Sequence, residues 1–224
     1  MEVLTMRWYR DNWYWFGGIL FIIEAIILLI WSGEMDMLLI FMILALMALH
    51  IHQFEEYAIP GGFPIFNNIA FMGETEIPDR FPLSKKGAFV CNVCCMYPVY
   101  ALALIFHQHI WVGLCIMIFG VSQFIVHGII INKRAGTIYN PGLASVILLF
   151  FPLLIAYIIY IYSNFTVGWL DWALAIVFIP IVGFVCLLLP MRKTSDRNAP
   201  DEDAWSEEYM KKFGIMEKLC GSKN

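Results

Sequence analysis

Long apolar runs separated by short polar connections occupy the chain from residue 13 to residue 190. A helix that crosses a membrane needs roughly 20 predominantly apolar residues, so runs of this length are typical of transmembrane spans. The pattern predicts six spans, at 13–31, 36–57, 87–106, 110–131, 142–163 and 168–190. We therefore predict an all-α fold, a polytopic transmembrane helical bundle of about six spans.

Basic residues flank the predicted spans at one end only. They precede the first span, lie between the second and third, and follow the fourth and the sixth: Arg7, Arg10, Arg80, Lys85, Lys86, Lys133, Arg134, Arg192, Lys193 and Arg197. The connections at the other end contain neither Lys nor Arg. Because cytoplasmic loops carry an excess of these residues, the pattern predicts a multi-pass protein of the cell membrane with both termini in the cytoplasm.

Two segments fall outside the spans. Residues 58–86 begin with Pro and Gly residues, which end a helix and allow a sharp turn. Their apolar stretch at 63–72 is too short to cross a membrane, so we expect an interfacial or re-entrant loop that serves as a lid. The chain then divides into a transmembrane helical domain, 1–190, and a polar cytoplasmic tail, 191–224. The patch at 205–219 of this tail is expected to rest on the membrane surface or to be partly disordered.

Composition supports a membrane protein and argues against a nucleic-acid partner. Hydrophobic residues make up 61% of the chain and charged residues 14%, whereas soluble domains have about 45–50% and about 25%. The net charge is −4, and no basic stripe is present. Cys91 and Cys94 form a C-x-x-C pair, but they lie at helical spacing in an apolar run, where cysteines pack as small hydrophobic residues.

The strongest concentration of chemistry is the run His52-Gln53-Phe54-Glu55-Glu56 at the end of the second predicted span. Residues three and four positions apart share one helical face, so one imidazole and two carboxylates are expected to point the same way. Helical zinc and iron motifs place nitrogen and oxygen ligands at the same spacing. The alternative is a polar helix end at the headgroup level, with solvated carboxylates and an interfacial histidine.

His127 lies at a matching depth in the fourth predicted span. Counted at 1.5 Å per residue from the basic residues 133–134, it is about 8–10 Å deep, and His52 is about as deep in its own span. We therefore predict a site for a divalent metal, either zinc, iron or manganese. Its expected ligands are His52, Glu55, Glu56 and His127. For His127 alone, a hydrogen-bonded packing role is the alternative.

Three amide side chains are expected close to this layer and are candidates for binding substrate: Asn92, Gln123 and Asn140. Asn140 precedes Pro141 and Gly142, and the exposed amides of a helix start would attract an anion or a ligand carboxylate. The alternative is ordinary helix-start chemistry, with Asn140 as the N-cap and Pro141 as the first helical residue.

Glu24 lies in the middle of the first predicted span, where an unpaired ionised side chain is costly. We expect it to pair with His52 or Gln123. Together with Glu55 and Glu56 it is a candidate catalytic residue or a member of a proton path. An uncharged Glu24 that is hydrogen-bonded to a neighbouring helix is the alternative.

The H-x-x-E-E run, taken with the later N-P-G run, resembles the HXXEE-domain family of small integral membrane proteins. The resemblance extends over roughly residues 45–190. It implies that a site is formed by His52, Glu55, Glu56, Asn140, Pro141 and Gly142. It implies no particular reaction or substrate.

These features favour a metal-dependent integral membrane enzyme that acts on a lipid or amphiphilic substrate at the cytoplasmic face. A glutamate left free of the metal could act as general base in a hydrolysis, and iron-dependent oxidation fits the same ligands. The alternatives are a proton-coupled small transporter with Glu24, His52 and Glu55 as a relay, and a non-catalytic membrane scaffold. Expected partners are membrane lipids and an amphiphilic small molecule, and a homo-oligomer is left open.

Overall fold

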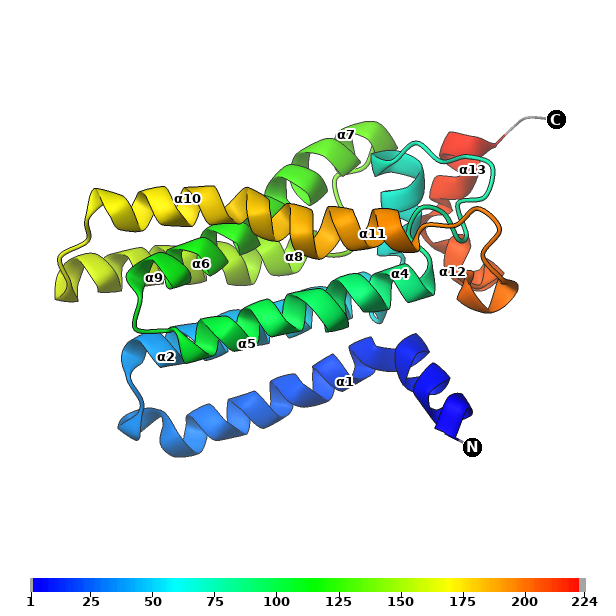
Figure 1. Ribbon diagram of the computed structural model, residues 1–224. Coiled ribbons are helices and arrows are strands. Elements are labelled where there is room, and N and C mark those ends of the chain that lie inside the picture. Colours follow the sequence, from blue (N-terminus) through cyan, green and yellow to red (C-terminus); the bar gives the residue numbers. More distant parts are fainter. Residues whose placement is uncertain (1, 222–224) are drawn as a thin grey trace.

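Long helices run side by side and form the body of the protein (Figure 1). The computed structural model describes residues 2–221, with side chains from Met6 onward, so residues 222–224 of the predicted tail lie outside the described part. Six helices in the described part are long and apolar enough to cross a membrane, which confirms the predicted all-α bundle. They are Met6–Glu34, Met37–Tyr57, Lys85–Ile105, Ile110–Ala135, Leu143–Asn164 and Trp169–Thr194.

The first span belongs to α1 (Glu2–Trp31), and a short turn, η1 (Ser32–Glu34), joins it to α2 (Met37–Tyr57). Each of the other four spans has α-helical ends and a wider, π-type turn between them. These composite helices are α4 (Lys85–Phe89), η3 (Val90–Met96) and α5 (Tyr97–Ile105); α6 (Ile110–Phe124), η4 (Ile125–Ile131) and α7 (Asn132–Ala135); α8 (Leu143–Ser145), η5 (Val146–Phe150) and α9 (Phe151–Asn164); and α10 (Trp169–Gly183), η6 (Phe184–Leu188) and α11 (Leu189–Thr194).

Proline accounts for three of these four wide turns. Pro98, Pro152 and Pro190 each lie two residues after the end of a π-type turn, at η3, η5 and η6 respectively. Proline has no backbone N–H, so the carbonyl four residues before it loses its helical donor, and the helix can widen there without losing a further bond. The prolines of the spans therefore mark where the helices depart from regular α geometry.

The start of α1 differs most from the prediction. The helix begins at Glu2, well before the apolar run at residue 13. Arg7 and Asp11 lie one turn apart and form an ion pair with a nitrogen–oxygen distance of 4.0 Å, which supports a helix in this polar stretch. By contrast, α2 begins where predicted, because the Asp36 carboxylate accepts the N–H of Leu38 at 2.6 Å.

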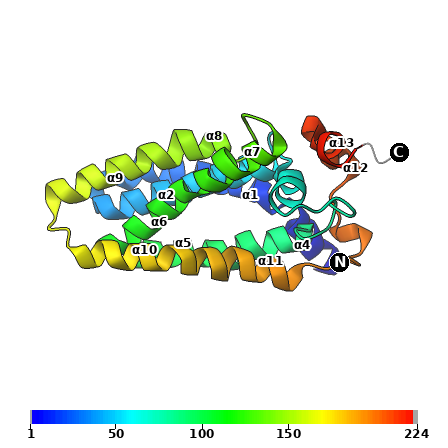
Figure 2. The ribbon, with the colours of Figure 1, turned by 90° about the horizontal axis from the view of Figure 1, so that it is seen from above.

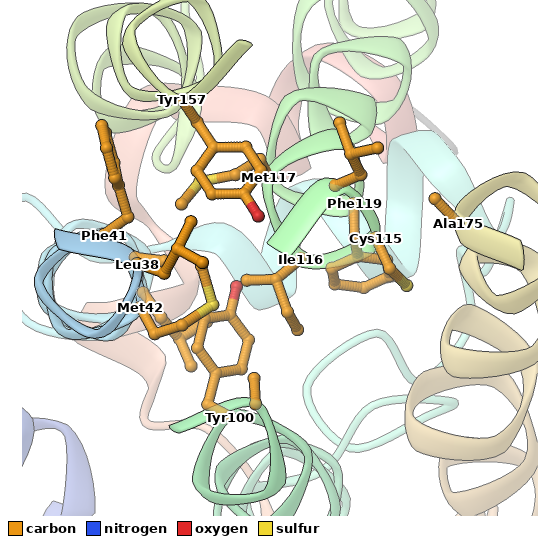
Figure 3. Packing of buried hydrophobic residues seen from close by; sticks show 14 of the residues in the cluster. Leu38, Phe41, Met42, Tyr100, Cys115, Ile116, Met117, Phe119, Tyr157 and Ala175 are labelled. Atoms are coloured by element: carbon orange, nitrogen blue, oxygen red, sulfur yellow. The ribbon is translucent and has the colours of Figure 1, made fainter. Parts of the chain in front are cut away.

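The spans pack around an apolar core in the half of the bundle away from the chain ends. Phe41 and Met42 of α2 approach Tyr157 of α9 and Met117 of α6 (Figure 3). Gly113 of α6 allows this contact, since a Cβ at that position would overlap the Tyr157 ring. Small residues let transmembrane helices pack closely where no water is available to drive association.

The segment 58–86 folds over the other end of the bundle. It contains α3 (Phe63–Ile65) and η2 (Phe66–Phe71), which are largely buried. Asn68, which is 0% exposed, binds the backbone of the later residues of this segment. Its side-chain N–H groups donate to the carbonyls of Pro78 (2.8 Å) and Leu83 (3.1 Å), and its Oδ1 accepts the N–H of Leu83 (3.0 Å).

The tail packs against the same end, beside the first residues of the chain (Figures 1 and 2). It contains η7 (Asp201–Asp203), α12 (Glu207–Met210), η8 (Lys212–Gly214) and α13 (Ile215–Cys220). Trp205, Met210 and Ile215 are buried, and the Trp205 indole N–H donates to the carbonyl of Leu83 at 2.9 Å. The expectation that this patch only rests on a membrane surface or is partly disordered is therefore wrong for these residues.

Candidate metal centre

Three of the predicted metal ligands, His52, Glu56 and His127, meet in a buried position where the end of α2 faces η4. His52 and Glu56 share one face of α2 because they are four residues apart. His127 lies at the same level, as predicted, and the two imidazole ring centres are 5.1 Å apart. Oε1 of Glu56 is 3.6 Å from Nε2 of His52 and 3.4 Å from Nε2 of His127.

The other ring nitrogen of His52 is bound to the turn before α8. Its Nδ1 lies 3.1 Å from the carbonyl oxygen of Gly142 and 3.0 Å from Oγ of Ser145. The Ser145 hydroxyl itself donates to the Gly142 carbonyl at 2.9 Å. Because a carbonyl only accepts hydrogen bonds, Nδ1 of His52 must carry the hydrogen and donate. Nε2 is then the nitrogen that faces Glu56.

Asn140 fixes His127 in the same way. Its side-chain N–H groups donate to the carbonyl of His127 and to Oδ1 of Asn132, both at 2.7 Å. Its Oδ1 must therefore be the atom that lies 2.7 Å from Nδ1 of His127, and Nδ1 donates. Asn140 is 0% exposed and its polar atoms are bonded within the protein, so it positions a histidine rather than facing a ligand.

Gly142 lets the turn before α8 approach both histidines. Its φ is +104°, a conformation that residues with a side chain rarely adopt. A Cβ there would overlap the His127 ring and would lie 2.9 Å from Cε1 of His52. Gly142 is also the N-cap of α8, so the prediction of Asn140 as N-cap is wrong. The glycine moves the helix start two residues further along the chain.

Glu55 faces the start of α8 instead of the centre. Its Oε1 accepts the Tyr139 hydroxyl at 2.9 Å and the N–H of Ala144 at 3.1 Å, and its Oε2 accepts the N–H of Ser145 at 2.8 Å. Successive residues of a helix point about 100° apart. Viewed down α2, the side chain of Glu55 therefore points to one side of His52 and that of Glu56 to the other. The expectation that both carboxylates join the metal ligands is therefore wrong.

The backbone N–H groups at the start of α8 thus bind a carboxylate, as is favourable at the start of a helix. This carboxylate is the side chain of Glu55 and not a ligand. Burial and the hydrogen bond to Glu55 raise the pKa of Tyr139, so its hydroxyl stays protonated and remains a donor.

Glu24 is also separate from the centre. Its Oε2 lies 3.0 Å from Nδ1 of His50, whose ring centre is 5.3 Å from that of Tyr97. His50 and His52 point about 200° apart on α2, so a residue paired with one cannot reach the other. The expected pairing of Glu24 with His52 or Gln123 is therefore wrong. Glu24 pairs with His50 instead and lies outside the group formed by His52, Glu56 and His127.

A cavity of about 440 Å³ begins at the centre and extends between the spans. His52 and Glu56 lie at its polar end, and Asn92 and Gln123, both predicted to bind substrate, also line it. The Asn92 side-chain N–H donates to the carbonyl of Ala88 at 2.9 Å, which holds the side chain against its own helix. Its Oδ1 accepts the side-chain N–H of Gln53 at 3.0 Å, so Asn92, like Asn140, is bonded within the protein, and of the two cavity amides Gln123 remains the candidate for contact with a ligand.

Sequence reasoning missed three residues that complete the centre. Ser145 binds His52, Tyr139 binds Glu55, and the ring of Phe63 covers His127 with ring centres 5.0 Å apart. Only Ser145 had a usable signal, since serine near the start of a helix often bonds to neighbouring backbone. The structure adds that Asn92 and His127 lie in the π-type turns η3 and η4, and such turns often occur at functional sites.

Comparison with known sequences agrees with the motif. A family described as "Protein of unknown function with HXXEE motif" matches residues 43–157, slightly more than half of the chain, and this range includes all three converging residues. The protein therefore belongs to the HXXEE family. No curated protein and no solved structure matches the chain.

Proposed function

We propose that the protein is a metal-dependent membrane enzyme with a centre formed by His52, Glu56 and His127. The observation that carries the proposal is the orientation of the two histidines. Both donate Nδ1–H to fixed acceptors, and both turn Nε2 toward Oε1 of Glu56. A divalent metal placed between these three atoms would bind one lone pair of each, as zinc and iron sites built from histidine and carboxylate do.

The two donor-atom separations that involve Glu56 are close to those around a metal ion. Two ligand atoms at about 2.0–2.1 Å from a tetrahedral zinc ion are about 3.3–3.4 Å apart. Oε1 of Glu56 lies 3.6 Å from Nε2 of His52 and 3.4 Å from Nε2 of His127. Two histidines and one carboxylate leave a coordination position open, as in catalytic zinc sites, and also suit non-haem iron. The bonds to Gly142 and Asn140 resemble the outer contacts that orient metal-binding histidines.

A divalent metal held there, either zinc, iron or manganese, would activate water or a substrate oxygen for hydrolysis or, with iron, dioxygen for oxidation. The chain supplies the remaining functions. Among the described residues, Glu56 is the one carboxylate that lines the cavity. It could therefore accept a proton as well as bind the ion. Glu55 anchors α8, and through it the turn that holds both histidines.

The surroundings support a lipid or amphiphilic substrate at the cytoplasmic face. The cavity leads from the polar centre into the apolar middle of the spans. Basic residues flank the spans at the end that carries the centre, including Lys85, Lys133 and Arg192, which by the positive-inside rule favours the cytoplasm for this end and for both termini. The buried helix at 63–71 would then cover the centre from the cytoplasmic side, as an interfacial or re-entrant lid.

The two neighbouring glutamates allow a matched test. Glu55→Gln and Glu56→Gln make the same change at adjacent, equally buried positions. In protein purified in detergent without chelator, we expect about one equivalent of zinc, iron or manganese in the parent. We expect a partial loss in Glu55→Gln, which loosens the turn before α8, and a near-complete loss in Glu56→Gln, which removes a proposed ligand. A parent that holds no metal after reconstitution with each ion, or a Glu56→Gln protein that keeps as much metal as the parent, would refute the centre.

A further inference from the structure

The cavity is long, and its lining changes along its length. Asn67 and Asn92 lie beside the centre, apolar side chains follow, and Tyr100 lies at the far end. The lining residues on one wall run from Asn92 to Tyr100, and on another from Met191 to Ile179. At 1.5 Å per residue these stretches correspond to about 12–18 Å. The cavity is therefore a narrow channel that leads away from the proposed metal into the membrane interior.

The volume sets the size of an occupant. An apolar protein cavity of about 150 Å³ holds benzene, which has six carbons. At the same density, the cavity of about 440 Å³ accommodates about 18 carbons. This is enough for one hydrocarbon chain and too little for the two chains of a membrane phospholipid.

The exposed lining residues indicate where the channel opens. α6 packs against α10 in the half away from the centre, and toward the centre η4 diverges from η6 (Figure 2). Gln123 and Val126 line the cavity on one side of this opening, and Phe184 and Leu188 on the other. Phe184 is 55% exposed and Leu188 48% exposed, although both are apolar residues of a transmembrane helix. Side chains of this kind face lipid chains, so the opening leads to the bilayer.

We infer that the substrate is a single-chain amphiphile of up to about 18 carbons that enters from the bilayer between η4 and η6. Its oxygen-containing head lies at His52, Glu56 and His127, and its chain fills the channel. This inference rests on the proposed function, because the position of the head presupposes the metal centre.

Gly183 offers a way to block the channel without disturbing the fold. It lines the cavity at the end of α10, and a Cβ there would meet only Cε2 of Phe119, at 3.9 Å. Leucine favours a helix more than glycine does, so Gly183→Leu narrows the channel at little structural cost. Gly33→Leu is the matched control, because Gly33 lies in η1 at the opposite end of α2 and a Cβ there meets nothing within 4 Å.

The probe is hexadecanoic acid with a photoreactive diazirine at its methyl end, added to the protein in lipid nanodiscs. Labelled residues are mapped by peptide mass spectrometry. We expect label on channel residues such as Met96 and Ile179 in the parent and in Gly33→Leu. In Gly183→Leu we expect a loss of about tenfold or more, since filling an already narrow space is strongly unfavourable. Val126→Trp, on the opposite side of the opening, should give the same loss.

Equal labelling in all variants would overturn the inference, and so would label confined to lipid-facing residues such as Leu29. A phosphatidylcholine with the same diazirine on one chain should leave the channel unlabelled, and labelling by it would contradict a single-chain substrate. Metal analysis of the same samples separates the two proposals. A parent with metal but an unlabelled channel refutes this inference alone, whereas a labelled channel without metal refutes the metal centre and the placement of the head.

Discussion

Replacing Asn140 with alanine tests whether an outer contact orients a metal ligand. The change removes three hydrogen bonds of 2.7 Å, two to His127 and one to Asn132. Each buried hydrogen bond contributes about 0.5–1.5 kcal/mol, so we expect the metal-free protein to lose about 1.5–4.5 kcal/mol of unfolding free energy. Loss of the contact to Nδ1 of His127 should also weaken metal binding by about 10–100-fold, as is usual for such outer contacts.

The two effects separate when stability is measured with and without metal. At a free metal concentration of 100 times the parent Kd, binding stabilises the folded protein by about 2.7 kcal/mol. With a 10- or 100-fold weaker site, the same concentration stabilises by only about 1.4 or 0.4 kcal/mol. The metal-dependent part of the unfolding free energy should therefore fall by about 1.3–2.3 kcal/mol in Asn140→Ala.

Asn68→Ala is the matched control for denaturant unfolding in detergent. Asn68 is equally buried and makes three comparable bonds to Pro78 and Leu83, but it contacts none of the metal ligands. The Asn68→Ala protein should lose a similar amount of unfolding free energy without metal. It should keep the full increase in unfolding free energy that metal gives the parent. The reasoning is refuted if Asn140→Ala keeps the parent increment, or if both variants lose it equally.

Two further substitutions test the other assignments. Glu24→Gln should lower the unfolding free energy by about 1–3 kcal/mol, because it replaces one oxygen of the carboxyl group that contacts His50. It should leave metal affinity, measured by titration, unchanged, and a loss of metal would place Glu24 at the centre after all. Trp205→Ala should cost about 3–5 kcal/mol of unfolding free energy because the side chain is buried, whereas Trp169→Ala, at 80% exposure, should change it by less than about 0.5 kcal/mol. Equal effects of the two tryptophans would contradict a tail that belongs to the fold.

The spans and the depth of the polar layer were predictable because both follow from distance along a helix. Each residue advances a helix by about 1.5 Å, so counting from the basic ends was enough to bring His52 and His127 to one level. The residue His52 and the residue four positions later, Glu56, share a face for the same reason.

Rotation about the helix axis was not predictable. Depth alone could not decide whether Glu24 meets His50 or His52, because that depends on how α1 lies against α2. The choice between Glu55 and Glu56 likewise depends on where α8 packs. The role of Asn140 depended on the positive φ of Gly142, which moves the helix start and turns the amide toward His127.

The tail also bears on the order in which the protein is assembled. Trp205 stacks on Tyr57, and the Tyr209 hydroxyl donates to the carbonyl of Glu56 at 3.3 Å, so the tail covers the last turn of α2. A ribosome synthesises these tail residues only after the sixth span, so during membrane insertion the three ligands are complete while their cover is missing. With the proposed centre and the proposed cytoplasmic orientation, an ion would reach the newly made site from the cytosol at that stage. Docking of the tail would then slow its exchange, and a chain cut after Thr194 should release the ion faster than the full protein.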